Sequence, residues 1–303
     1  MVADRPDPEP GAGELLVRVH AAGLNNADLL QLRGAYPAPA DSPPDIPGME
    51  FAGEVVATGA RVTRFAAGDR VMAVVGGGAQ AELALVHERA AMPVPPTMGW
   101  AEAGGFPEVF TTAHDALFTQ AGLAMGERAC VHGAAGGVGT AAVQLAAAAG
   151  ASVVATVRSA DKRHAVAALA EGVTVVAPDD FATRGPYDVV LELIGGPNMP
   201  ANLGALATGG RIVVIGVGAG FSAEVNLLAL MACRGRISAS TLRARPLEAK
   251  ADAARRVEAQ VLPLVAAGRI RVPVEEAFAL EDAPAAYARF AAGGKLGKIV
   301  LTP

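Results

Sequence analysis

The hydrophobic pattern of the first third of the chain predicts short strands separated by turns. The segment Glu14–Leu24 alternates apolar and polar residues and places Leu15, Val17 and Val19 on one face. Three further apolar runs follow, each bounded by glycine or proline, at residues 51–59, 68–75 and 80–86. Closely punctuated strands of this kind are typical of a small β-barrel.

A proline-rich stretch, GAYPAPADSPPDIPG at residues 34–48, interrupts these strands. Proline removes a backbone donor and fixes φ, so we expect an irregular loop here. The loop is long for a simple connection between strands, which favours a role in lining a pocket.

The pattern changes near residue 106, where apolar runs begin to alternate with helical segments. We predict a strand at 128–134, a helix at 140–150, a strand at 152–157 and a helix at 162–172. Further apolar runs follow at 173–178, 187–195 and 210–218. This β-α-β order predicts a parallel sheet that is covered by helices on both faces.

The end of the chain combines a charged helix, predicted at 248–268, with a final strand at 297–303. That strand has no place in the alternating pattern, so we expect it to return to the first domain. The predicted fold class is α/β. Residues 1–107 with 247–303 would form a β-rich domain, and residues 108–246 a doubly wound parallel-sheet domain.

Composition narrows the classes of protein that the chain could represent. Apolar residues make up 52% of the 303 positions, which is enough for two hydrophobic cores, and the net charge is -5. There is no basic stripe for nucleic acid, no uncharged run of roughly 20 apolar residues for a membrane, and no signal-peptide pattern. The two cysteines, Cys130 and Cys233, lie far apart, as is typical of buried thiols in a reducing cytosol.

The strongest local motif is HGAAGGVGTAAVQLA, which begins at His132 between a predicted strand and a predicted helix. Ala134, Gly136 and Gly139 occupy the three positions of a dinucleotide fingerprint, with alanine in place of the first glycine. Glycine lets the backbone approach a pyrophosphate, whose charge would face the N–H groups of the helix. A glycine-rich turn before an alanine-rich helix is the structural alternative. The residues predicted to bind the cofactor here are Ala135, Gly136, Gly137, Val138 and Gly139.

The next strand favours NADPH over NADH. An NAD site usually places an acidic residue at this strand end to bind the ribose hydroxyls. Here the strand runs into Arg158, Ser159 and Lys162, which could bracket a 2′-phosphate. Asp161 lies one residue late, and we expect it to cap the following helix. A solvated helix start is the alternative, but basic side chains at a helix N-terminus oppose the helix dipole.

Several ordered motifs resemble one family over nearly the whole chain. They are GLNNADLLQLRGAYP, PGMEFAGEV, GDRVMA, FPEVFTTA, HGAAGGVGTAAVQLA and GKLGKIVL. The chain resembles the medium-chain dehydrogenase/reductase superfamily and, within it, the zinc-less, zeta-crystallin-like NADPH:quinone oxidoreductases. The resemblance implies a GroES-like catalytic domain interrupted by a Rossmann domain, an active site in the cleft, and a homodimer.

Zinc members of this superfamily hold the metal with a cysteine after the first strand and a histidine in a GHE motif. The matching stretches here read GLNNAD and GMEFAG, with Asn25 or Asn26 near the cysteine position and Met49 at the histidine position. Without a Lewis acid, oxidation of an alcohol through a metal alkoxide is unfavourable. A quinone or a conjugated carbonyl needs less polarisation and is the expected acceptor.

The resemblance also assigns site residues. Asn25, Asp28 and Tyr36 match family positions beside the nicotinamide and substrate, although Tyr36 could equally anchor packing and Asp28 could simply fix its loop. Arg243 and Arg245 could be solvated, and His132 could touch the cofactor or form a structural hydrogen bond. The other positions assigned to the cofactor are Thr112, Ile194, Gly195, Gly216, Val217, Leu242 and Lys298.

The sequence therefore predicts a cytoplasmic NADPH-dependent reductase that transfers hydride directly to a quinone or another electron-poor acceptor. Orientation of the reactants would supply most of the catalysis. An enoyl or alkenal reductase would use the same hydride chemistry and is the nearest alternative. A non-catalytic NADPH-binding protein and a fold reused for a non-redox step are alternatives of a different class.

Overall fold

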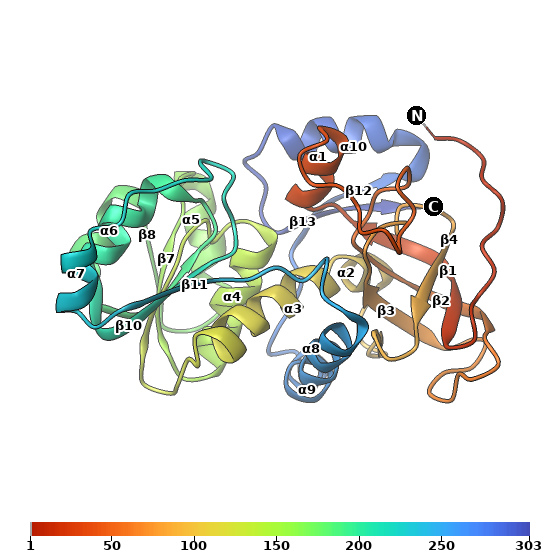
Figure 1. The fold of residues 1–303 in the computed structure, drawn as a ribbon, viewed down its shortest axis with the longest axis horizontal. Coiled ribbons are helices and arrows are strands. Elements are labelled where there is room, and N and C mark those ends of the chain that lie inside the picture. The colour runs from red at the N-terminus through yellow and green to blue at the C-terminus, as the bar shows by residue number, and fades with distance from the viewer. Residues whose placement is uncertain (1) are drawn as a thin grey trace. The chain divides into compact units, whose positions relative to one another are not determined.

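A computed structural model describes residues 2–303, and this part of the chain forms two compact units (Figure 1). Unit 1 comprises the described residues up to Thr111 together with Leu242–Pro303. Unit 2 comprises Thr112–Thr241. The boundaries expected from the sequence, 107/108 and 246/247, lie within a few residues of these positions.

Unit 1 is built on a largely antiparallel seven-stranded sheet, ordered β12-β13-β1-β2-β3-β5, with β4 paired to β1. Only β12 and β13 run parallel. β13 pairs with β1, so that Ala22 lies opposite Leu301, and the tail returns to the first unit as the sequence predicts. The strands are β1 (Glu14–Gly23), β2 (Glu50–Thr58), β3 (Arg70–Val74), β4 (Leu83–His87), β5 (Ala91–Pro93), β12 (Val274–Ala279) and β13 (Lys298–Thr302).

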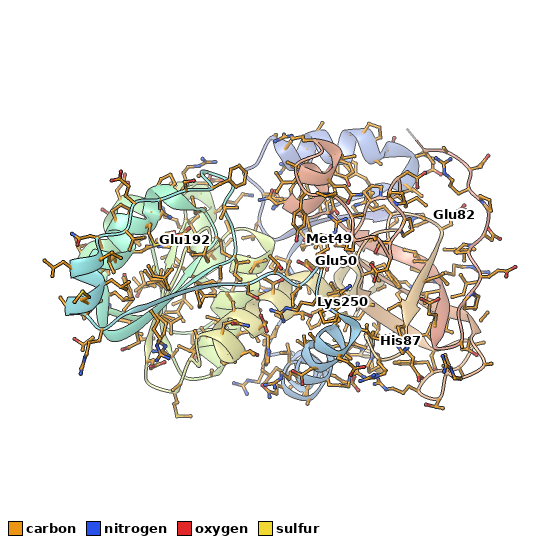
Figure 2. The ribbon with its side chains drawn as sticks, viewed as in Figure 1. Met49, Glu50, Glu82, His87, Glu192 and Lys250 are labelled. Carbon is orange, nitrogen blue, oxygen red and sulfur yellow. The ribbon has the colours of Figure 1, made fainter. Side chains whose placement is uncertain are left out.

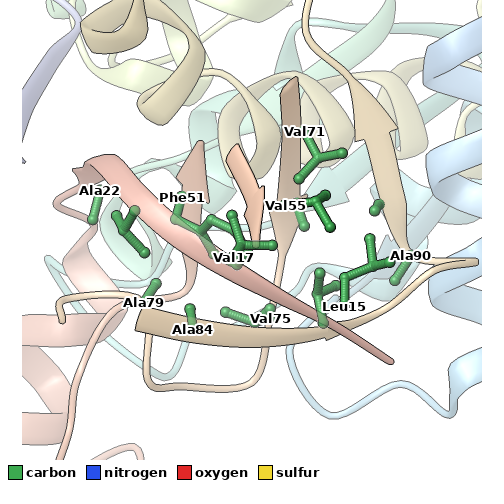
Figure 3. Close-up of a cluster of buried hydrophobic side chains, with 14 residues drawn as sticks. Leu15, Val17, Ala22, Phe51, Val55, Val71, Val75, Ala79, Ala84 and Ala90 are labelled. Carbon is green, nitrogen blue, oxygen red and sulfur yellow. The ribbon is translucent and has the colours of Figure 1, made fainter. Parts of the chain in front are cut away.

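The core of unit 1 follows from the alternating pattern of these strands. Successive side chains of a strand point to opposite faces, so every second residue of β1 can be buried. Figure 3 shows Leu15 and Val17 of β1 meeting Phe51 and Val55 of β2 in one buried cluster. Val71 of β3 belongs to the same cluster, which ties three strands together.

The helices of unit 1 differ from the sequence-based expectation in two respects. Two short helices, α1 and α2, lie in the region predicted to be strands and loops. The single helix predicted at 248–268 is divided, because the ring of Pro263 conflicts with a helical carbonyl four residues earlier. The proline-rich stretch at 34–48 contains no helix or strand, as predicted. The helical elements are α1 (Asn26–Leu32), α2 (Trp100–Gly104), α8 (Leu247–Gln260), α9 (Leu262–Ala266), η4 (Leu280–Asp282) and α10 (Ala283–Ala291), and α3 (Pro107–His114) continues from unit 1 into unit 2.

Unit 2 contains a parallel six-stranded sheet, in the order β11-β10-β9-β6-β7-β8. Numbered along the unit, this order reads 6-5-4-1-2-3, which is the arrangement of a dinucleotide-binding Rossmann fold. The parallel sheet confirms the prediction from the alternating pattern. The strands are β6 (Arg128–Val131), β7 (Ser152–Thr156), β8 (Val173–Val176), β9 (Tyr187–Glu192), β10 (Leu206–Val214) and β11 (Arg236–Ala239).

The helices of unit 2 lie along the sheet (Figure 1). Helix α4 packs on β6 and β7, α5 on β8, and α6 on β10. The helical elements are η1 (Asp115–Gln120), α4 (Gly137–Ala148), α5 (Ala160–Ala167), η2 (Pro178–Arg184), η3 (Gly196–Asn198), α6 (Met199–Gly204) and α7 (Leu227–Ala232). Within residues 2–303, no helix has the length and apolar character needed to cross a membrane.

The strand order of unit 2 positions a ligand site. The chain builds outward from β6 through β7 to β8 and then crosses to β9 on the other side of β6. Loops that leave β6 and β9 at their carboxyl ends therefore diverge and open a crevice at the sheet edge. The glycine-rich motif follows β6 directly, so it lies at this edge.

Candidate active site

A buried ion pair organises the first half of the predicted site, within unit 1. The Lys298 ammonium donates to the Leu24 carbonyl (2.7 Å), to Asn25 Oδ1 (2.8 Å) and to Glu50 Oε1 (2.6 Å). Glu50 (Figure 2) is fully buried and Lys298 is 2% exposed. The second oxygen of Glu50 accepts the backbone N–H of Glu108 at the start of α3 (2.8 Å). Both charges are thus paired and hydrogen-bonded, as burial requires.

This ion pair changes the interpretation of Lys298. The sequence assigns this lysine to the cofactor, but each of its three N–H donors has an acceptor in unit 1. No donor is left over for a cofactor phosphate or ribose. In the structure, Lys298 therefore neutralises Glu50 and orients the side chain of Asn25.

Asn25 is the N-cap residue of α1, and its amide is held in one orientation. Its Nδ2 donates to Glu50 Oε1 (2.8 Å), while its Oδ1 accepts from Lys298. The two contacts fix which end of the amide carries the donors. Any acceptor that approaches Asn25 therefore meets a rigid side chain.

Asp28 fixes the first turn of α1. Its Oδ2 accepts the backbone N–H of Asn25 (2.8 Å), while its buried Oδ1 has no hydrogen-bond partner in the described structure. Burial raises the pKa of Asp28 to about 6, and the neighbouring Glu50 charge adds to this, against the Asn25 N–H and the Lys298 charge. These contacts agree with the expectation that Asp28 holds its loop.

Arg243 is buried, which corrects the expectation that it could be solvated. Only 1% of its surface is exposed, and it donates to the carbonyls of Gly76 (2.7 Å) and Tyr36 (3.0 Å) and to Gln31 Oε1. Its guanidinium also lies 5.2 Å from the centre of the Tyr36 ring. One arginine thus ties the proline-rich loop to α1 and to the chain that follows β3.

Tyr36 is held by these contacts and is partly exposed. Burial raises the pKa of its hydroxyl, so Tyr36 stays protonated at neutral pH and can act as a hydrogen-bond donor. Leu242 is buried and lines a small apolar pocket together with Val74, Met92 and Ala254.

The glycine loop of unit 2 has the geometry that the fingerprint requires. Gly133 adopts φ +59°, a conformation that favours glycine, and Gly136 is the N-cap of the 12-residue helix α4. A Cβ on Gly139 would lie 2.5 Å from the Gly133 carbonyl oxygen, so only glycine allows this close packing. The first N–H groups of α4 have no acceptor within the helix and suit a phosphate.

The loops after β9 and β10 lie against the glycine loop and each other. A Cβ on Gly133 would lie 2.9 Å from Ile194 Cδ1, and one on Gly195 would lie 3.0 Å from Val217 Cα. A Cβ on Gly216 would lie 2.2 Å from the carbonyl oxygen of Leu193, the residue after β9. The structure therefore brings most cofactor positions expected in unit 2 to one edge of the sheet.

The segment after β7 carries the residues expected to select NADPH. Arg158 is exposed and Lys162 is half-buried. Ser159, and not Asp161, is the N-cap residue of α5, and its side chain forms no cap hydrogen bond. Asp161 lies inside the first turn, where its charge favours the helix dipole. Thr112 is buried in α3, at the first position of unit 2.

A buried polar network lies beneath the loops of unit 2, and His132 is the one member of it that the sequence analysis considered. Glu192 (Figure 2) is fully buried, and its Oε1 accepts the N–H groups of Ile194 (2.6 Å) and Gly195 (2.8 Å). His132 is also buried, and burial lowers its pKa, so the imidazole is neutral. Its hydrogen bonds to Asn202 and Thr156 agree with the structural role considered for it.

Sequence reasoning therefore missed Glu50, Glu192 and the burial of Arg243. A weak signal existed for the two acids, because each is a carboxylate within or beside an apolar strand, in EFAGEV and YDVVLELIG. A charge in such a run is either paired or functional. No comparable signal marked Arg243, because its partners are distant in sequence.

Comparisons with known proteins agree with this architecture. Residues 11–119 match the alcohol dehydrogenase GroES-like domain, and residues 170–301 match the family described as zinc-binding dehydrogenase. A quinone oxidoreductase of Pseudomonas aeruginosa is 32% identical, over 97% of this chain and 93% of its own length. An acryloyl-coenzyme A reductase of Metallosphaera sedula is 31% identical, over 98% of this chain and 94% of its own.

A quinone oxidoreductase of Pseudomonas syringae has a similar structure, with a TM-score of 0.87 and 29% identity over 99% of this chain and 94% of that one. The mycobacterial protein Rv1454c, solved in complex with NADPH, also gives a TM-score of 0.87, with 27% identity over 99% and 94% of the two chains. The chain therefore belongs to the medium-chain dehydrogenase/reductase superfamily of oxidoreductases, with a GroES-like domain and a Rossmann-type nucleotide-binding domain.

Several relatives are much longer than this chain. Erythronolide synthase EryA2 of Saccharopolyspora erythraea is 36% identical over 96% of this chain, yet the match spans only 8% of that polypeptide. The chain spans between 4% and 14% of the other matched polyketide synthases.

Proposed function

We propose that this chain is an NADPH-dependent reductase that gives hydride to an electron-poor, conjugated acceptor without using zinc. The observation that carries the proposal is the edge of the unit 2 sheet, where the glycine loop caps α4 beside the loops after β9 and β10. This arrangement fits a dinucleotide, because the positive φ of Gly133 and the close packing at Gly139 require glycine, and Gly136 at the N-cap leaves the start of α4 free of a Cβ. A reduced nicotinamide dinucleotide supplies a hydride when bound.

The preference for NADPH rests on the segment after β7. Arg158 extends into solvent, and the hydroxyl of Ser159 is not used to cap α5. A guanidinium and a hydroxyl at this position suit a 2′-phosphate better than a free ribose hydroxyl, and Lys162 adds a second cation. The similar mycobacterial structure that contains NADPH gives independent support.

The proposal of zinc-free chemistry rests on the residues in unit 1. Met49 is buried next to Glu50, and Asn25 is already bonded to Lys298 and Glu50. A thioether and an engaged amide are poor ligands for zinc, which prefers thiolate, imidazole or carboxylate. The charge of Glu50 is balanced by an ammonium, so no metal is required for that purpose.

Two classes of acceptor are supported by the relatives. The quinone oxidoreductases favour a quinone. The acryloyl-coenzyme A reductase favours an α,β-unsaturated thioester, in which the carbonyl activates the double bond. Tyr36 would donate a hydrogen bond to the acceptor oxygen, and Asn25, held rigid by Lys298, would help to orient the acceptor. Asp28 supports this loop from beneath.

The decisive experiment follows the loss of reduced-nicotinamide absorbance with each cofactor and each acceptor class. NADPH and NADH are compared with an ortho-quinone and with an acyl-coenzyme A ester carrying an α,β double bond. We expect turnover with NADPH, and the faster acceptor identifies the substrate class. Tight binding of NADPH with no turnover on either acceptor would point to the non-catalytic alternative.

The variant Arg158→Ala tests the cofactor assignment. Loss of a charge-assisted contact to a phosphate is expected to raise the KM for NADPH about tenfold and leave that for NADH nearly unchanged. Arg269→Ala removes an exposed arginine in unit 1 and is the matched control. Equal effects of Arg158→Ala on both cofactors would contradict the assignment.

A further inference from the structure

The buried network of unit 2 joins four side chains from four different elements. Thr156 ends β7, His132 follows β6, Asn202 lies in α6, and Glu192 ends β9. All four are at most 2% exposed. No part of the proposed hydride transfer uses them, although they lie directly beneath the loops assigned to the dinucleotide.

The hydrogen bonds of Asn202 fix the protonation of His132. Asn202 Nδ2 donates to Glu192 Oε2 (2.7 Å), so the other end of this amide, Oδ1, is an acceptor. His132 Nε2 lies 2.7 Å from that oxygen and must therefore carry a proton. The Glu192 carboxylate thus determines the orientation of the Asn202 amide, because a carboxylate can accept a hydrogen bond from Nδ2 but not from the oxygen Oδ1.

The hydrogen bond on the other side of the His132 imidazole has the same donor-to-acceptor direction. A neutral His132 with a proton on Nε2 has an accepting Nδ1, which lies 3.1 Å from Thr156 Oγ1. The Thr156 hydroxyl therefore donates to His132, and its oxygen accepts the backbone N–H of Gly133 (3.3 Å). Donation runs in one direction, from Gly133 through Thr156, His132 and Asn202 to Glu192.

The network ends on the loop after β9. Glu192 Oε1 accepts from the N–H groups of Ile194 and Gly195, and more distantly from Asn198 Nδ2 (3.4 Å). Gly133 and Ile194 also lie close together, since a Cβ added to Gly133 would come within 2.9 Å of Ile194 Cδ1. One chain of hydrogen bonds therefore joins the first residue of the glycine loop to the first residues of the β9 loop.

We propose that Thr156, His132, Asn202 and Glu192 form a one-way hydrogen-bond relay that holds these two loops in the arrangement that binds the dinucleotide, and that the relay requires the neutral Nε2–H tautomer of His132. The four are positioning residues, since they act through the loop backbone. The consequence for cofactor binding rests on the proposed function, whereas the tautomer does not.

The surroundings of His132 keep this tautomer. Glu192 Oε2 lies 3.9 Å from Nε2, and the thiol of Cys130 on β6 lies 3.8 Å from the same nitrogen. Phe181 from η2 presents a ring edge at 4.6 Å between centroids, and Asn202 and Thr156 are uncharged. Burial, and then the neighbouring Glu192, raise the pKa of Cys130, so its thiol stays neutral.

The first test measures the tautomer directly. Imidazole nitrogen chemical shifts are recorded on the full chain with ¹⁵N-labelled histidine, and the His132 signals are assigned with His132→Gln. We expect a protonated Nε2 and an unprotonated Nδ1 at neutral pH. An Nδ1–H tautomer or an imidazolium would overturn the relay, whatever the protein catalyses.

The second test measures the dissociation constant for NADPH in matched variants. Thr156→Val keeps the shape of the side chain and removes the hydroxyl, so we expect Kd to rise about tenfold, the equivalent of one lost hydrogen bond. Thr156→Ser keeps the hydroxyl and should stay within about twofold of the original Kd. Glu192→Gln places an amide against N–H donors and should weaken binding as well.

The outcomes separate the relay from the proposed function. Lower melting temperatures with an unchanged Kd in Thr156→Val would mean that the network only stabilises the unit, and would overturn the positioning role. Absence of NADPH and NADH binding in the original chain would overturn the proposed function, while the nitrogen shifts would still decide the relay.

Discussion

The buried charges of Lys298 and Glu50 in unit 1 are tolerated because they pair with each other at 2.6 Å. Lys298 and Glu50 lose their hydration, which costs several kcal/mol per ion unless hydrogen bonds replace it. The Leu24 carbonyl and the Asn25 amide oxygen accept the two remaining hydrogen bonds of the Lys298 ammonium. Asp28 is less fully compensated, because one of its oxygens has no partner. A buried carboxylate in that condition makes stability depend on pH.

Asp28→Asn should remove a specific pH dependence. Burial raises the pKa of Asp28 from 3.8 to about 6, so the folded protein binds this proton more tightly than the unfolded chain. The linked stability is present below about pH 4 and is lost as the pH rises through 6, to a total on the order of 3 kcal/mol. Asparagine stays neutral at every pH. The free energy of unfolding of Asp28→Asn should therefore increase relative to that of the original chain as the pH rises.

Denaturant unfolding at pH 4.5 and pH 7.5 measures this difference. Asp7→Asn, at an exposed position, is the control and should leave the pH dependence unchanged. Parallel stability curves for Asp28→Asn and the original chain would show that Asp28 does not carry the effect.

At the scale of elements, the sequence predicted those helices, strands and loops whose conformation depends on a few neighbouring residues. The glycine loop and α4 form where the fingerprint predicts them, because a positive φ and close packing are requirements that a few residues impose. Short helices such as α1 and α2 escaped prediction, since five to seven residues give too little periodicity to recognise.

Gly139→Ala should damage the glycine loop. The added Cβ would lie 2.5 Å from the Gly133 oxygen and 2.6 Å from Ala134 Cα, so the backbone must shift. Overpacking of this kind costs about 1–3 kcal/mol, and we expect a lower melting temperature and weaker dinucleotide binding. Calorimetry and NADPH titration measure the two effects.

Gly204→Ala is a matched control in α6. A Cβ at Gly204 meets no atom within 4 Å, so alanine should be neutral or stabilise by up to about 1 kcal/mol. A Gly139→Ala variant as stable as Gly204→Ala would contradict the close packing of the loop.

At the scale of the molecule, one surface of unit 2 supports the predicted homodimer. Among residues 2–303, strand β11 pairs only with β10 and forms an edge of the sheet, which a second copy could extend by two-fold symmetry. The same part of the chain exposes large apolar side chains. Leu227, Leu228 and Met231 of α7 are 67%, 74% and 71% exposed.

We expect the chain to be a dimer in solution and Leu228→Glu combined with Met231→Glu to make it monomeric. Two charges in an apolar interface would be desolvated without partners, which opposes association. Light scattering after size-exclusion chromatography measures the mass. Leu32→Glu, at an exposed leucine of unit 1, should leave the dimer intact. A monomeric original chain would refute the prediction.

The sequence by itself determined the features that depend on neighbouring residues. The alternation of apolar and polar residues predicted the strands of unit 1, and the β-α-β order predicted the parallel sheet of unit 2. The spacing of the glycines predicted the loop before α4. These features follow from periodicity and local backbone chemistry, which a single segment expresses on its own.

Only the tertiary structure decided which distant side chains meet. Lys298 and Glu50 are 248 positions apart, and Arg243 and Tyr36 are 207 apart. Their contacts depend on the return of the tail to β1 and on the burial that this return creates. A lysine or arginine looks the same in the sequence whether it is solvated or paired, because the cost of burial and its compensation arise only after the chain has folded.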